Sequence, residues 1–154
     1  MTLNEECVRD VLIYCKNNID YRELQDGSSS LIPVTFKQLL ASPLNQTYDS
    51  KDIMYTVMKL EEIGFIKISN RNPKASPYIN ECLINEITYV GHKFIDATEP
   101  EPVWDKTKNI VGKVGNHTLE FVEGVAHDVA VEFAKVVAFK QGQLSTKSAT
   151  LGTT

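Results

Sequence analysis

The chain has 154 residues, of which 42% are hydrophobic and 23% charged, and its formal net charge is −4. This composition is close to that of globular proteins and argues against intrinsic disorder, a collagen-like repeat or a disulfide scaffold. No apolar run approaches the roughly 18 residues of a membrane-spanning helix, and the N-terminus has neither the basic start nor the apolar centre of a signal peptide. We therefore expect a cytoplasmic protein with one domain, or with one domain and a short appendage.

The first helix is predicted over residues 3–18. Thr2 followed by Glu5 is a capping-box pattern, which marks the start of a helix. The apolar residues that follow recur at helical spacing: Val8, Val11, Leu12, Cys15 and Ile19. One face of this helix is therefore expected to be buried.

A polar stretch separates this helix from the next elements. Residues 21–30 end in Asp-Gly-Ser-Ser-Ser and are predicted to be a loop, because such residues form turns and have little to bury. Residues 31–34 are apolar but contain Pro33, which has no backbone donor, so they form at most an edge strand. Thr35 is placed to cap a short helix over residues 36–41.

A longer helix and a hairpin follow. Asp49 and Ser50 mark the start of a helix that runs to about residue 63, and Gly64 is at the position of a C-terminal glycine. Residues 65–68 and 78–84 read as two strands separated by a polar loop, which predicts a hairpin.

The remaining chain is predicted to be helical. Thr88 caps a helix that ends before the Glu-Pro-Glu-Pro linker at residues 99–102. Further helices are expected over residues 104–114 and 118–140, and the polar residues 141–154 are expected to be a disordered tail. The buried side of the helix after Thr88 is predicted to consist of Val90, Phe94 and Ile95.

The predicted order is helix, short strand, short helix, longer helix and hairpin, which is the order of a winged helix-turn-helix. The fold class we expect is therefore mainly α with a small β-hairpin. The winged helix-turn-helix domain would span residues 1–98, and C-terminal helices would occupy residues 103–140 after the linker.

Four stretches carry a family resemblance: residues 6–12 (ECVRDVL), 54–66 (MYTVMKLEEIGFI), 87–96 (ITYVGHKFID) and 103–108 (VWDKTK). They resemble a family of small proteins from Gram-positive bacteria and their phages, known as domain of unknown function twenty-five thirteen. The resemblance covers most of residues 1–140. It implies a phage or prophage setting and a winged-helix-like body followed by helices, and it supplies neither an activity nor catalytic residues.

Candidate DNA contacts fall into two groups. The predicted wing contains Lys67, Arg71 and Lys74 with no acid from residue 65 to residue 80, and such cations neutralise DNA phosphates. A solvated hairpin tip is the competing interpretation, because charge also keeps an exposed edge from pairing with another molecule. The second group lies near the predicted turn and at the start of the following helix: Lys37, Gln38, Asn45, Gln46, Tyr48 and Lys51.

The predicted helix that runs from Ser50 to about residue 63 has an exposed face of mixed charge. Lys51 and Lys59 share it with Asp52 and Glu62, and a carboxylate near a phosphate is repelled. The pI is near 5.4, far below that of a typical nucleic-acid-binding domain. Any contact with DNA is therefore expected to be local and modest.

No pattern in the sequence predicts a metal site or a catalytic site. His92, His117 and His127 do not show the close ligand spacing of zinc sites, and there is no nucleophile elbow, phosphate loop or metalloprotease motif. The three cysteines suit reduced thiols, and Cys7 and Cys15 lie on the apolar face of the first helix. We expect no cofactor, no metal and no enzymatic activity.

The last predicted helix carries a seam with heptad spacing, which suggests oligomerisation. Packing of the seam on the winged body competes with a homodimer, because fewer than three heptads are present. Attachment to a membrane surface fits poorly, because acids outnumber bases on this helix. The seam consists of Leu119, Val122, Ala126, Val129, Phe133 and Val136.

Two functions remain open at this point. The first is a small phage-associated regulator that binds double-stranded DNA through the wing and the turn. The second is a protein-interaction module that binds a host or phage protein, for example as a modulator of host defence. The basic wing favours the first function, and the acidic overall balance favours the second.

Overall fold

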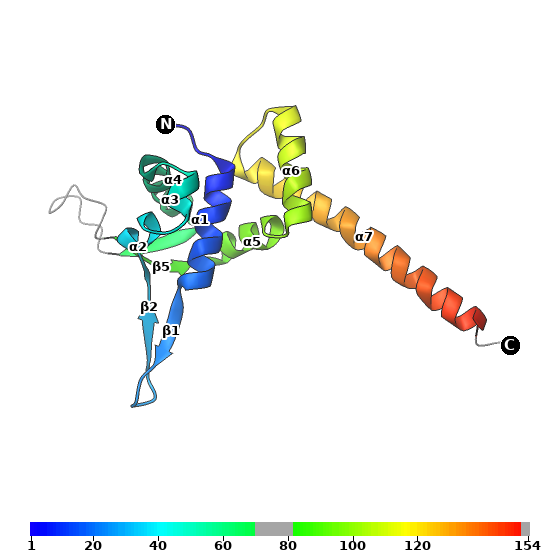
Figure 1. Cartoon of the computed structure of the whole chain (residues 1–154), viewed down its shortest axis with the longest axis horizontal. Coiled ribbons are helices and arrows are strands. Elements are labelled where there is room, and N and C mark those ends of the chain that lie inside the picture. The colour runs from blue at the N-terminus through cyan, green and yellow to red at the C-terminus, as the bar shows by residue number, and fades with distance from the viewer. Residues whose placement is uncertain (70–81, 152–154) are drawn as a thin grey trace. The chain divides into compact units, whose positions relative to one another are not determined.

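The computed structural model describes the backbone of residues 1–69 and 82–151, with side chains as far as residue 142. The chain divides into two compact units, Met1–Glu99 and Pro100–Thr154. It is mainly α-helical with small antiparallel sheets, as predicted (Figure 1).

Helix α1 (Glu5–Asn18) begins slightly later than predicted. Its N-cap is Asn4, whose side-chain oxygen accepts hydrogen bonds from the backbone amides of Glu6 (2.9 Å) and Cys7 (3.3 Å). The predicted capping box that starts at Thr2 is therefore wrong. The apolar face is buried as expected, with Val8, Val11, Leu12 and Cys15 all fully inaccessible.

The predicted loop after α1 is a β-hairpin. Strands β1 (Asp20–Glu23) and β2 (Ser29–Ile32) pair antiparallel, and Gly27 makes the turn with φ of 83°. Almost every residue of this hairpin is exposed, so the strands lack the alternation of apolar and polar residues by which a half-buried strand is recognised. Loop prediction failed here for that reason.

A second sheet has three antiparallel strands. They are β3 (Val34–Thr35), β4 (Ile66–Ser69) and β5 (Leu83–Ile87), in the order β3-β5-β4. Strand β3 lies at an edge, as the nearby Pro33 predicts. The returning strand β5 runs further along the chain than the predicted 78–84, and residues 78–81 lie outside the described part.

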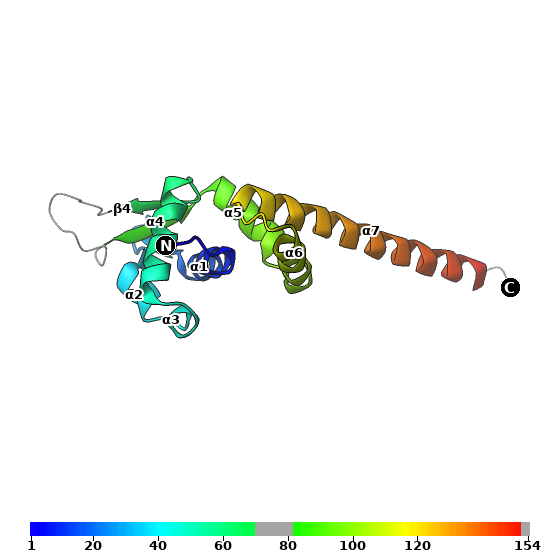
Figure 2. The ribbon, with the colours of Figure 1, turned by 90° about the horizontal axis from the view of Figure 1, so that it is seen from above.

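Three helices lie between β3 and β4. Helix α2 (Phe36–Leu40) is capped by Thr35, and α4 (Ser50–Glu62) is capped by Asp49, both as predicted. The sequence analysis missed α3 (Leu44–Thr47), which has only four residues and no buried apolar face. Figure 2 shows these helices grouped beside α1. The predicted elements follow one another in the predicted order, and the β1–β2 hairpin and α3 are additions to it.

Helix α5 (Tyr89–Thr98) closes the first unit. Thr88 caps it by accepting from the amide of Gly91, and its hydroxyl donates to the carbonyl of Gly64 (2.5 Å). Phe94 and Ile95 are buried, but Val90 is 49% exposed, so its predicted burial is wrong. Val90 lies in the first turn of α5, whose buried residues are Gly91, Phe94, Ile95 and Thr98.

Buried polar groups tie α1 to the rest of this unit. The Arg9 guanidinium donates to the carbonyls of Thr98 and Glu99, each at 2.7 Å. Both carbonyls lie at the end of α5, where helical acceptors lack partners. Arg9 therefore acts as a C-terminal cap from a distant helix.

The second unit contains α6 (Glu101–Val114) and α7 (Leu119–Leu151), which pack against each other. Pro102 belongs to the first turn of α6, where proline is tolerated, so the second half of the predicted 99–102 linker is helix. Gly115 ends α6 with φ of 78°. Helix α7 continues to Leu151, beyond the predicted end at residue 140 and into the stretch expected to be a disordered tail.

Candidate nucleic-acid interface

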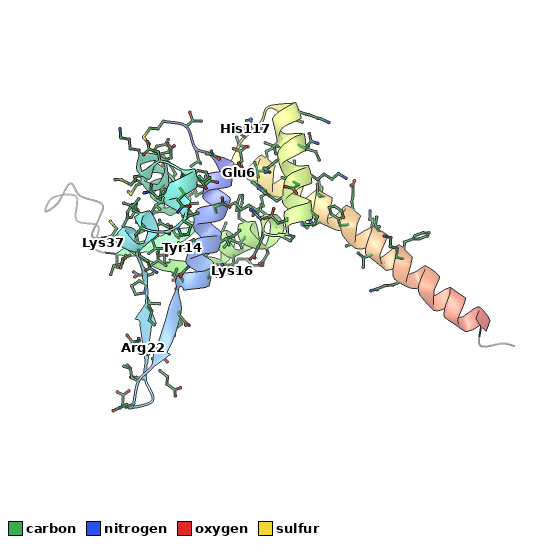
Figure 3. The ribbon with its side chains drawn as sticks, viewed as in Figure 1. Glu6, Tyr14, Lys16, Arg22, Lys37 and His117 are labelled. Atoms are coloured by element: carbon green, nitrogen blue, oxygen red, sulfur yellow. The ribbon has the colours of Figure 1, made fainter. Side chains whose placement is uncertain are left out.

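The residues predicted near the turn lie on three consecutive helices. Lys37 and Gln38 are exposed on α2, Asn45 and Gln46 are exposed on α3, and Lys51 is exposed in the first turn of α4. Lys37 is labelled beside α2 in Figure 3. The structure thus collects five polar side chains on the segment that precedes the wing.

Tyr48 has a different role from the one predicted. It is half-buried, and its hydroxyl donates a 2.6 Å hydrogen bond to the carboxylate of Asp10. Burial and this hydrogen bond to Asp10 raise the pKa of Tyr48. Tyr48 therefore links the α3–α4 turn to α1, and its hydroxyl is engaged within the protein.

The charges at the C-terminal end of α4 neutralise one another. The Lys59 ammonium lies 2.5 Å from the carboxylate of Glu62 and 5.6 Å from the ring centroid of Tyr55. The hydrogen bond with Glu62 raises the pKa of Lys59. Together with Met58 and Glu61, these residues line an open hollow of about 650 Å³.

The helix-turn-helix segment as a whole carries no positive excess. From residue 36 to residue 62 there are three lysines and four acids, a balance of 3 − 4 = −1. The lysines at residues 37 and 51 lie on the α2 side and at the start of α4, whereas Lys59 is paired at the other end. Positive charge available to phosphates is therefore confined to the turn.

The wing offers one described cation, and that cation is paired. Lys67 on β4 stands opposite Glu86 on β5, and their charged atoms are 3.2 Å apart. Both side chains are more than half exposed, so the pair adds little to stability but reduces the local charge. Arg71 and Lys74, the other two predicted wing contacts, lie outside the described residues.

The predicted oligomerisation seam is divided into two parts. Its first four residues, from Leu119 to Val129, are buried, and α7 packs on α6 in this unit. Phe133 and Val136, at the other end, are 39% and 52% exposed. Only the second part of the seam is open to another chain.

One surface feature was not found by sequence reasoning. A groove of about 450 Å³ lies where the end of α1, the β1 strand, β5 and the start of α5 meet. Tyr21 and Tyr89 line it and are 68% and 80% exposed, whereas Ile87 in the same groove is buried. Tyr21 was placed in a loop, and its nearness to Tyr89 depends on contacts between elements remote in sequence.

The remaining candidate chemistry concerns thiols, metals and membranes. Cys7, Cys15 and Cys82 are free and buried, and burial raises the pKa of Cys15 to about 12. Within the described ranges, no three His, Cys, Asp or Glu side chains gather in a way that could hold a metal ion. No helix in that same part of the chain is long and apolar enough to cross a membrane.

Comparison with known proteins places the chain in a family. No curated protein and no solved structure matches it. A family model described as "Hypothetical protein (DUF2513)" matches residues 2–117, a range that includes α1 to α6 and stops before α7. Because this match covers well over half of the chain, the protein belongs to the DUF2513 family.

Proposed function

We propose that the protein binds double-stranded DNA through α2, α3, α4 and the β4–β5 wing, as a small phage-associated transcriptional regulator that acts without chemistry. The observation that carries the proposal is the topology. Two short helices and a longer helix lead directly into a hairpin whose returning strand pairs with β3. In DNA-binding proteins with this order of elements, the longer helix enters the major groove.

The position of Lys51 supports contact through the N-terminal end of α4, where the exposed acids Asp49 and Asp52 offset part of its charge. Recognition helices use their N-terminal residues to contact base edges. Lys51 is exposed there, and Lys37 and Gln46 are exposed on the preceding short helices. Each end of α4 carries two acids, and Glu61 and Glu62 lie at the end furthest from a groove that the first turn enters.

A fluorescence anisotropy titration with a DNA duplex at several salt concentrations tests the proposal. Replacing Lys37 and Lys51 by alanine should weaken binding to every sequence and lower the salt slope by about 2. The matched control replaces Lys16 and Lys93, exposed lysines on α1 and α5, which changes the net charge equally. Equal effects of the two double variants, or no binding by the wild type at low salt, would reject DNA binding through this face.

The wing is tested separately. Replacing Lys67, Arg71 and Lys74 together should lower the salt slope by up to about 3 if all three contact phosphates. A smaller change is expected if the pairing of Lys67 with Glu86 persists on DNA.

Self-association through α7 belongs to the same proposal. Helix-turn-helix proteins bind two half-sites when copies are joined, so the assembly must present at least two DNA-binding faces. The exposed part of the seam, Phe133 and Val136, is where another copy would be held.

A protein-interaction module is the second candidate function, and the groove favours it. Tyr21 and Tyr89 are exposed beside a concave surface, and tyrosine is enriched among the residues that contribute most to protein interfaces. A pull-down should compare the wild type with a Tyr21→Ala/Tyr89→Ala variant in the presence of nuclease. A partner that resists nuclease and is lost from the variant would support this function, and equal capture by both would reject the groove as its site.

A further inference from the structure

The second half of α7 exposes five large apolar side chains: Val131 (40%), Phe133 (39%), Val136 (52%), Val137 (55%) and Phe139 (66%). Soluble proteins rarely leave such a group in contact with water, and contiguous apolar patches mark interaction surfaces. Only two charged residues, Glu132 and Lys135, interrupt the stretch from residue 129 to residue 139. Residues 131–139 therefore form an exposed apolar segment of α7.

Helix α6 is too short to cover the exposed apolar segment of α7. It has 14 residues and α7 has 33, which correspond to lengths of about 21 Å and about 50 Å. Lys106 reaches α7 at Glu132, 3.2 Å away, and its ammonium lies 6.0 Å from the ring centroid of Phe133. Because Lys106 is already in the second turn of α6, little of α6 remains to flank the residues after Phe133.

The exposed apolar residues surround α7. Successive helical residues are about 100° apart, so with Val136 as the reference, Phe133 and Val137 lie at about 60° and 100°, and Val131 and Phe139 at about 220° and 300°. Within residues 131–139, the widest interval, between Val137 and Val131, contains only alanines 134 and 138. The charged residues Lys135 and Glu132 lie on either side of Phe139, at about 260° and 320°. No single direction of approach covers all five side chains.

A two-stranded coiled coil would leave part of this surface in water. In such a coil only the a and d positions face the partner, while e and g are charged. Continuing the spacing of the buried seam places Phe133 at a and Val136 at d, and it places Val137 at e and Phe139 at g. Apolar residues at all four positions require neighbours on more than one side, as in a helix bundle.

We propose that residues 131–139 of α7 form a self-association surface on which each helix is flanked by helices from at least two other copies of this chain. A second copy suits this surface because its charge is balanced, with Glu132 against Lys135 (1 − 1 = 0), so copies do not repel one another. Closed symmetric assemblies also need a patch that complements itself. The face of α7 at Phe133 and Val136 continues, at heptad spacing, the one that already packs in this unit.

The test is the mass of the full chain, measured by analytical ultracentrifugation at tens of micromolar. The expected mass is at least three times the 17.3 kDa of one chain. A monomer would overturn the proposal. A dimer would also overturn it, because a dimer supplies only one neighbour.

Three variants locate the surface. Val136→Glu combined with Val137→Glu alters one side of α7 and should reduce the mass to that of a monomer. The circular dichroism spectrum should be unchanged, because both side chains are more than half exposed. Val131→Glu alters the opposite side of α7 and should also lower the mass. Val90→Glu, at a 49% exposed valine of α5, is the matched control and should leave the mass unchanged.

The outcome for Val131→Glu is decisive for the number of neighbours. If this variant keeps the wild-type mass while the Val136/Val137 variant does not, α7 has a neighbour on one side only and the proposal fails. Flotation of a monomeric wild type with phosphatidylcholine–phosphatidylglycerol vesicles would identify a lipid surface as the occupant and would likewise overturn it. The measurement needs no DNA, so its result is independent of the proposed DNA binding.

Discussion

The two units of the chain differ in how completely they bury their apolar faces. In the first unit, Val8 of α1, Ile53 of α4 and Phe94 of α5 are all fully buried. In the second unit, α7 buries Val129 but exposes Phe139 to 66%. The seam of α7 keeps the same heptad spacing from its buried residues, Leu119 to Val129, to its exposed residues, Phe133 and Val136, so the pattern alone does not decide burial. An apolar face becomes core only where another element of matching length lies against it.

The largest expected effect contrasts two phenylalanines from the two units. Phe94→Ala should lower the free energy of unfolding by about 3–5 kcal/mol, because it leaves a cavity beside Phe65, whose ring centroid is 5.5 Å away. Phe139→Ala should change it by no more than about 0.5 kcal/mol when the protein is dilute, as for other surface substitutions. Urea denaturation measures both. Similar decreases in the free energy of unfolding of the two variants would show that the end of α7 is part of a core.

Arg9 offers a second contrast, between a buried and an exposed cation of α1. Arg9→Ala should cost about 1–3 kcal/mol for each of the two carbonyls that it leaves without a donor. Lys16→Ala removes an exposed pair with Glu99 and should cost no more than about 1 kcal/mol. Thermal unfolding of the two variants compares them. If Arg9→Ala were as mild as Lys16→Ala, water would have to replace the guanidinium at the end of α5.

The buried thiol of α1 predicts a loss of stability in alkali. Burial raises the pKa of Cys15 from its ordinary value of 9.0 to about 12. Between these two values the unfolded chain releases a proton that the folded chain retains, so the free energy of unfolding should fall by about 1.4 kcal/mol per pH unit. Below pH 9 this group causes no pH dependence.

Urea denaturation of the wild type and of Cys15→Ala, below and above pH 9, measures this effect. The variant should be less stable at neutral pH but should lose less stability as the pH rises. Burial and Asp10 also raise the pKa of Tyr48, so some alkaline loss should persist in the variant. Parallel pH profiles would contradict the assignment to Cys15.

The smallest expected effect concerns the start of α1. Asn4→Ala should cost about 1 kcal/mol, because the backbone amides of Glu6 and Cys7 lose their acceptor. Thr2→Ala, at the residue that the sequence pattern suggested as the cap, should have no measurable effect. Thermal unfolding compares the stability of the two variants. A larger loss of stability in Thr2→Ala than in Asn4→Ala would support the predicted capping box.

The candidate DNA-binding face shows the same division between pattern and neighbourhood. The sequence identified Lys37, Gln46 and Lys51 as polar residues near a turn, and the structure exposes all three there. The sequence did not predict that Tyr48 donates a hydrogen bond to Asp10 or that Lys67 pairs with Glu86. Each of these two contacts joins residues far apart in the chain, so no local pattern predicts them.

What the sequence determined by itself is the set of local events. The caps at Thr35, Asp49 and Thr88 and the left-handed Gly64 are found where predicted, because capping depends on a side chain and an amide two or three residues away. Only the tertiary structure decided that the polar segment after α1 forms a hairpin and that the seam of α7 is half buried. Strand pairing and burial depend on which surfaces meet, and that depends on the lengths and positions of elements that are distant in sequence.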